Sequence, residues 1–257
     1  MNSQNLKIKP EISIVIPTFN EESNIKRTLY SIKKQRCNVP FEVFIADGQS
    51  TDNTVKIAQK FATVIITPQR GKALQVNYVV PKTSGDILIF LDADTIIPPL
   101  FLEKIYNLFK KKKDLFACSA RFKYNNGTKF SIKIGNKQFT ITTFFFYNWG
   151  SYLYYFIRYL FGYPELAGCN IIVRRNIFFK VGGFKNPPKS WGIDKIFTDA
   201  ILYYIKKTGF GKVKTLSSIH VLTSGRKVSI KRGLERVYQY QTNKELYSNL
   251  AKKDIST

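Results

Sequence analysis

The chain of 257 residues contains few acidic side chains, few thiols and a single histidine. Its 17 aspartates and glutamates stand against 41 lysines and arginines, which gives a formal net charge of +24. Such an excess predicts an attraction for phosphates, whether those of nucleic acid, of lipid head groups or of a small substrate. The three cysteines, Cys37, Cys118 and Cys169, are far apart and form no Cys-x-x-Cys pair. This argues against a zinc site or a disulfide framework and favours reduced thiols in a cytosolic setting.

The first ten residues are polar and include lysines, so we expect no signal peptide. We therefore expect a cytoplasmic protein. The one long aromatic run, residues 144–161, has the length of a membrane span. Its Tyr and Trp content and the interruptions at Asn148, Ser151 and Arg158 instead favour a helix lying in the interface of the cytoplasmic leaflet. The alternative is an ordinary core helix with tyrosines on its surface.

The most informative stretch is Ile87–Leu91, five apolar residues that end abruptly at Asp92-Ala93-Asp94. A continuous apolar run bounded by turn residues predicts a strand buried on both faces. In open α/β sheets, ligands bind at the carboxyl edge, where the two aspartates would lie. Oxygen ligands suit Mg²⁺ or Mn²⁺, which usually also holds substrate phosphates. The alternative is a turn with two solvated aspartates.

Strand and helix patterns alternate through the first half of the chain. Strands are predicted at 12–16, 41–46, 64–66, 87–91 and 115–120, with helices between them. Short links predict βαβ units and a largely parallel sheet, so Asp47 and Asp92, which end two strands, should face the same crevice.

The second half is less regular. It predicts a weak strand at 130–141, a strand after Gly168, a helix at 194–207 and short strands at 213–216 and 219–222. The simplest division is one domain of residues 1–226 and a basic helical tail of residues 227–257.

Five segments occur in a recognisable order, and together they span most of the chain. They are residues 14–22, 46–52, 70–73, 90–94 and 173–184. The series resembles glycosyltransferase family 2, with the GT-A fold, over roughly residues 12–226. The resemblance implies an α/β, Rossmann-like, mostly parallel sheet flanked by helices, with helical and aromatic elaborations toward the C-terminus. It also implies an inverting, metal-dependent transfer of a sugar from a nucleoside diphosphate to an acceptor hydroxyl. The basic surface and the aromatic segment suggest a polyprenyl-linked acceptor on the cytoplasmic leaflet, with a sugar or glycan as the alternative.

The resemblance assigns the donor contacts residue by residue. Phe19, in the turn that begins Pro17-Thr18, would flank the nucleobase, and Glu21 and Asp47 would contact base and ribose. Arg70 and Lys72 would make charge-assisted bonds to the diphosphate. Asp92, followed by Ala93, would lie on the ribose side, and Asp94 would bind the divalent metal, Mg²⁺ or Mn²⁺.

Later residues carry more open assignments. His220 could complete the metal shell or be structural, and Arg226 is a further candidate for the diphosphate. Asp199 is predicted to be the general base, although Thr198 stands where the family usually has a glutamate. Asp194 is the rival, with helix N-cap or acceptor contact as its other roles. Trp191 could stack on an acceptor sugar or fill a hydrophobic gap.

Two other functions are alternatives to sugar transfer. A nucleotidyltransferase would use a Gly-rich phosphate loop after the first strand, but Pro17-Thr18-Phe19-Asn20 stands there. A non-catalytic nucleic-acid-binding protein would explain the net charge through phosphate contacts. No recognition motif supports it, and we expect no nucleic-acid partner.

Overall fold

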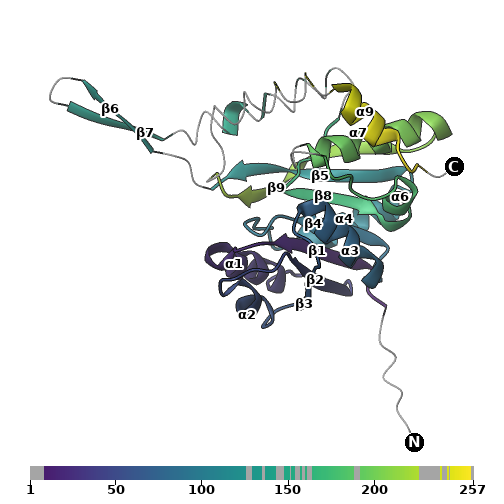
Figure 1. Cartoon of the computed structure of the whole chain (residues 1–257), viewed down its shortest axis with the longest axis horizontal. Coiled ribbons are helices and arrows are strands. Elements are labelled where there is room, and N and C mark those ends of the chain that lie inside the picture. Colours follow the sequence, from purple (N-terminus) through teal and green to yellow (C-terminus); the bar gives the residue numbers. More distant parts are fainter. Residues whose placement is uncertain are drawn as a thin grey trace, which may run out of the picture.

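The computed structural model describes residues 9–125, 164–187, 192–225 and 244–255, several residues of 148–160 and of 238–242, and the backbone of 129–134 and 137–142. Seven strands form one sheet in the order β3-β2-β1-β4-β8-β5-β9, and a separate hairpin projects from it (Figure 1). The sheet strands are β1 (Ile12–Thr18), β2 (Phe41–Asp47), β3 (Thr63–Ile66), β4 (Ile87–Leu91), β5 (Leu115–Tyr124), β8 (Asn170–Arg174) and β9 (Lys212–Thr223).

Helices follow the strands in the alternation that the sequence predicts. They are α1 (Glu22–Lys33), α2 (Thr54–Ala58), α3 (Lys72–Val79), α4 (Phe101–Lys111), α6 (Arg175–Lys180), α7 (Ile193–Thr208) and α9 (Lys244–Lys252), with a 3₁₀ turn at Val80–Lys82. Strand β1 pairs in parallel with β2 and with β4. Strand β2 also pairs in parallel with β3, and β5 pairs in parallel with β9. Strand β8 is antiparallel to its two neighbours, β4 and β5. The predicted mostly parallel sheet is therefore confirmed, and β1, β2 and β4 end at one edge.

The central strand β4 is buried on both faces, as its unbroken apolar run predicts. Because side chains alternate along a strand, Leu88 and Phe90 join one core, with residues of α3, α6, α7 and α9. Ile87, Ile89 and Leu91 join the other core, with residues of α1, α2 and α4. Helix layers on both faces thus hold β4 in the middle of the molecule, and its last residue delivers the Asp92-Ala93-Asp94 loop.

Two strand predictions in the second half are corrected. Residues 213–216 and 219–222 belong to one strand, β9, whose register against β5 shifts between Ala120 and Arg121. The exposed pair Ser217-Ser218 interrupts the apolar pattern but not the extended backbone, because a bulge absorbs the extra residues. The predicted strand at 130–141 is a hairpin of β6 (Lys129–Ile134) and β7 (Lys137–Thr142).

The aromatic segment is described only in part, and residues 148–150, 152–153, 157 and 160 are helical. Within the described residues, no helix combines the length and apolarity needed to cross a bilayer. Helix α9 lies beside α7 (Figure 1) and buries Tyr247 and Ala251 in the core. Asp254, just after it, accepts from Lys185 at 3.1 Å. The division at residue 226 stays a prediction, since most of 226–243 lies outside the described residues.

One close backbone approach fixes how β4 enters the sheet. The backbone N–H of Gly85 donates to Ser13 Oγ at 2.7 Å, and Ser13 Oγ donates to the Glu42 carboxylate at 2.6 Å. A β-carbon on Gly85 would lie 2.5 Å from the Ser13 nitrogen and 2.6 Å from the Ile12 carbonyl carbon. Only glycine fits here without moving the β1 backbone.

We predict that Gly85→Ala lowers the free energy of unfolding by about 1–3 kcal/mol, the usual cost of overpacking. Urea unfolding would measure this as a lower midpoint at unchanged slope. Gly150→Ala is the matched control, because Gly150 is exposed, helical and has no atom within 4 Å of an added β-carbon. Equal midpoints for the two variants would contradict the close approach.

Candidate active site

The carboxyl ends of β1 and β2 meet at a buried aspartate. Asp47, which ends β2, is fully buried and accepts from Thr18 Oγ1 at 2.8 Å, at the end of β1. It also accepts from Ser50, through the backbone N–H at 2.7 Å and the hydroxyl at 2.6 Å. These bonds hold the turn after β2 in place. Thr18 and Asp47 therefore converge as expected, while the nucleobase or ribose contact of Asp47 stays a prediction.

Gln75 is a buried residue of this edge that the sequence analysis missed. Its amide nitrogen donates to the carbonyls of Thr18, at 2.8 Å, and Ala46, at 2.6 Å. Its amide oxygen accepts from the backbone N–H of Gly71 at 3.1 Å. One side chain thus ties the start of α3 to the ends of two strands. A single glutamine within a helix gives no distinctive sequence signal, so only the contacts reveal this role.

Phe19 and Glu21, predicted near the base, lie after β1, and Arg70, predicted at the diphosphate, lies on a neighbouring loop. The Arg70 guanidinium lies 3.6 Å from the centre of the Phe19 ring, which makes a cation–π contact. Glu21 is buried, its carboxylate accepts from Asn24 Nδ2 at 3.1 Å, and its N–H donates to Thr54 Oγ1 at 2.7 Å. Pro17, the residue before Thr18 in β1, is partly buried. The structure therefore brings Phe19 and Arg70 together at the carboxyl edge of the sheet, beside the end of β1.

Lys72 lies at the centre of the site. Its ammonium donates to Asp92 Oδ1 at 2.5 Å and to the carbonyl oxygen of Gly168 at 2.6 Å. Burial opposes the charged form, but the attraction of Asp92 and Asp194 together favours it, so the pKa of Lys72 is raised. The ammonium is therefore a fixed positive charge, next to the place where a diphosphate is predicted to lie.

Asp94 faces the end of β9. Its Oδ1 accepts from Thr223 Oγ1 at 3.2 Å, and its side chain is partly buried. Two backbone bonds between Ile96 and Leu222, of 2.7 and 2.9 Å, fasten the loop to β9. The buried Ala93 between the aspartates accepts from Thr28 Oγ1 at 2.8 Å through its carbonyl, which ties the loop to α1. Arg226, like Trp191, lies outside the described residues.

His220 is not brought to Asp94. It lies three residues before Thr223 on β9, so its side chain emerges on the opposite face from the one that contacts Asp94. Partial burial and the charges of Lys123 and Arg121 lower the pKa of His220. Its predicted place in a metal shell has no support from this geometry.

The residue types at the Asp92–Asp94 loop still fit a hard divalent cation. No group of three or more His, Cys, Asp or Glu that could hold a metal occurs among the described residues. Mg²⁺ and Mn²⁺ sites that also hold phosphates need only one or two carboxylates, because phosphate and water oxygens supply the rest. Asp92 is engaged by Lys72, which leaves Asp94 as the principal candidate ligand.

The two candidate bases occupy different surroundings. Both oxygens of Asp199 accept from Lys195 Nζ, at 2.6 and 2.5 Å, one helical turn earlier. Asp194, at the start of α7, has its Oδ2 2.9 Å from the position of a β-carbon on Gly168. Its charge also raises the pKa of Lys72. The structure therefore places Asp194 with the Lys72–Asp92 pair, whereas the sequence favoured Asp199.

Cys169 also lies in this cluster, although the sequence analysis only counted it. Its carbonyl accepts from the N–H of Asp92 at 3.1 Å. Burial, together with the negative charge of Asp92, raises the pKa of the Cys169 thiol to about 12. The thiol is therefore neutral near pH 7 and is a poor nucleophile.

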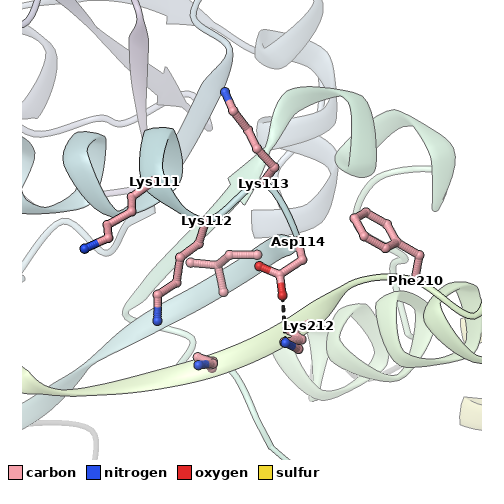
Figure 2. Close-up of a pocket in the computed structure, with 8 residues that line it drawn as sticks. Lys111, Lys112, Lys113, Asp114, Phe210 and Lys212 are labelled. Carbon is pink, nitrogen blue, oxygen red and sulfur yellow. Dashed lines mark ion pairs between the residues drawn. The ribbon is translucent and has the colours of Figure 1, made fainter.

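A hollow with a volume of about 480 Å³ lies at the opposite, amino-terminal ends of β5 and β9. Figure 2 shows lysines around it, with Asp114 paired to Lys212 at 2.7 Å. Its lining comprises Lys111, Lys112, Lys113, Asp114, Leu115, Phe210, Lys212 and Lys214. These residues precede or begin β5 and β9 or end α4, so this hollow is separate from the Asp92 edge.

Comparisons with solved structures place the fold among glycosyltransferases. A mannosyltransferase from Pyrobaculum calidifontis, in complex with GDP-Man and Mn²⁺, superposes with a TM-score of 0.62 at 20% identity, over 91% of this chain and 63% of that one. Glucosyl-3-phosphoglycerate synthase from Mycobacterium tuberculosis, in complex with Mn²⁺ and UDP, gives 0.61 at 18% identity, over 94% and 81%. At these identities the likeness shows the fold, and the predicted GT-A fold is confirmed.

Sequence comparisons point to the same family. Glycosyltransferase AglE of Haloferax volcanii is 32% identical over 127 residues, which cover 46% of this chain and 42% of that protein. This chain therefore spans less than half of that relative's length. The sequence model of the family described as glycosyl transferase family 2 matches residues 13–182. The chain belongs to glycosyltransferase family 2.

Proposed function

We propose that this chain transfers a sugar, with inversion, from a UDP- or GDP-sugar to an acceptor hydroxyl, and that it needs a divalent cation. The observation that carries the proposal is the convergence of the Phe19–Arg70 stack, the Lys72–Asp92 pair and Asp94 at one sheet edge. The names of the structural relatives support the donor class, since those proteins were solved with GDP-Man or UDP, and with Mn²⁺.

The donor would lie across the ends of β1, β2 and β4. Phe19 and Arg70 offer a flat surface for a base, and Arg70 and Lys72 offer positive charge for a diphosphate. Asp94 would hold the cation, which when bound neutralises charge on the departing diphosphate. Asp92 fixes the Lys72 ammonium beside it.

Asp194 is the base that the geometry supports best. In the transfer step the acceptor oxygen forms a bond to the anomeric carbon, the bond from that carbon to the diphosphate breaks, and the hydroxyl proton passes to a carboxylate. Asp194 lies beside Gly168, whose carbonyl accepts from Lys72. Asp199 instead forms an ion pair with Lys195. One base and one displacement lead to inversion, and the neutral Cys169 thiol offers no covalent route.

A lipid-linked acceptor at a membrane surface is the further part of the proposal. Trp149, Leu153, Ile157 and Leu160 are exposed and helical, with spacings of four, four and three residues. Such spacing places them on one face. An apolar face on a strongly basic protein suits the interface of an anionic leaflet. The cytoplasmic side of the membrane stays a prediction.

We predict that Asp94→Asn removes the effect of Mn²⁺ on nucleotide binding. Titration of UDP and GDP by calorimetry should show that Mn²⁺ tightens binding to the wild type by about tenfold or more, or about 1.4 kcal/mol, and leaves the variant unchanged. Asp86→Asn is the matched control, because Asp86 is exposed at the start of the same strand and pairs with Lys9. A variant at position 94 that kept the Mn²⁺ effect would rule out this ligand.

We predict that Asp194→Asn lowers turnover by about 10²–10⁴-fold, because the base is lost, while nucleotide affinity changes little. Release of nucleoside diphosphate from a panel of UDP- and GDP-sugars, with water as the acceptor, would measure turnover. Asp199→Asn should lose far less. The reverse order of the two variants would restore Asp199 as the base.

A further inference from the structure

Another hollow, with a volume of about 370 Å³, opens at the carboxyl ends of β5 and β9. Its walls come from both strands, from Asn148, Trp149 and Tyr152, and from Ala167. The Asn148 side chain accepts from the N–H of Tyr124 at 2.8 Å, which holds the helical segment against the end of β5. The volume lies in the range of pockets that bind small ligands.

The charged side chains of this hollow are all basic. Arg121 and Lys123 come from β5 and His220 from β9, and the first two lower the pKa of His220, so the three groups face a common space. Arg121 and Lys123 form no ion pair with any residue of the described chain, and no described Asp or Glu lines the hollow. Positive charge without a protein counter-ion favours an anionic ligand.

Two aromatic side chains complete the wall. Trp149 is 59% exposed and Tyr152 is 46% exposed, and the Arg121 guanidinium lies 4.1 Å from the centre of the Tyr152 ring. The stack presents a flat apolar surface next to the cations. It suits a ligand with an apolar face on one side and an anionic group on the other.

The hollow adjoins the proposed reaction centre at the turn of Ala167 and Gly168. Ala167 lines it, and the next residue, Gly168, accepts from Lys72 at 2.6 Å and lies against Asp194. The buried Asn170 side chain anchors this turn, since its oxygen accepts from the N–H of Ala120 at 2.6 Å. A ligand in the hollow could therefore extend one hydroxyl past Ala167 toward Asp194.

We propose that this hollow is the acceptor site and that it selects a phosphorylated acceptor, an inference that rests on the proposed function. Arg121 and Lys123 would bind the phosphate, and Trp149 and Tyr152 would pack on the adjoining sugar or isoprenoid. His220 belongs to this acceptor wall and not to a metal shell. The phosphate could belong to a soluble sugar phosphate or to a lipid carrier, because both present the same group to the two cations.

The test is calorimetric titration of the full chain, in the presence of UDP or GDP and Mn²⁺, with two matched ligand pairs. Glucose 6-phosphate is compared with glucose, and farnesyl phosphate with farnesol. We expect at least one phosphate to bind the wild type more tightly than its neutral partner, and Arg121→Gln with Lys123→Gln to weaken that binding by about tenfold or more. The pair that responds identifies the soluble or the lipid source.

The control variant is Lys111→Gln with Lys113→Gln, which removes the same charge from the hollow at the other strand ends. It should leave phosphate binding unchanged. Equal weakening in both double variants, or phosphates that bind no better than their neutral partners, would overturn the acceptor site. Titration of UDP and GDP separates the two proposals: a wild type that binds neither nucleotide overturns the proposed function, whereas normal nucleotide binding without phosphate selectivity overturns only this inference.

Discussion

The ammonium group of Lys72 joins three separate parts of the chain at one point. It lies at the start of α3, and it binds the Asp92 carboxylate after β4 and the Gly168 carbonyl before β8. Asp94 and Asp194 bring further negative charge to the same region, so a neutral side chain at position 72 would leave like charges together. The pair is only partly buried, but removing one partner still leaves the other charge uncompensated. The arrangement of the whole edge therefore depends on this contact.

The donor half of the edge is held by polar side chains that are already satisfied within the protein. Asp47 binds Thr18 and Ser50, and Gln75 binds two strand carbonyls and the N–H of Gly71. Buried groups with complete hydrogen bonds keep a fixed geometry. A diphosphate-sugar would thus meet a preformed surface, with Phe19 and Arg70 as its exposed part.

The proposed acceptor half of the edge instead offers basic groups and exposed aromatic rings. Arg121 and Lys123 have no carboxylate partner within the described chain, and Trp149 and Tyr152 are exposed. Three of the protein's acids, Asp92, Asp94 and Asp194, lie at the proposed reaction centre. The two signs of charge therefore lie at different proposed positions, although the net charge is +24. Acidic side chains lie where a cation and a base are proposed, and basic side chains lie where phosphates are proposed. Family membership sets aside a nucleotidyltransferase as an explanation of the acidic pair.

Local patterns alone predicted the strands that carry the donor edge. The run Ile87–Leu91 can be satisfied only by burial on both faces, and the parallel alternation places Asp47 and Asp92 at one edge whatever the details of packing. The resemblance of the ordered motifs likewise predicted the family. The strands follow from sequence periodicity and chain connectivity, and the family follows from motif order, and all of these are visible without a structure.

Only the tertiary structure decided which of several similar residues meet. Asp194 and Asp199 are five positions apart on α7, so they point about 140° away from each other, and the packing of the helix selects the one that faces Gly168. The bulge in β9 and the pleat after it turn His220 away from the Asp94 contact that Thr223 makes. The role of Gln75 depends on two strand ends that are distant in sequence. In each case the rotation of an element about its own axis determines the contact, and that rotation is set by the whole core.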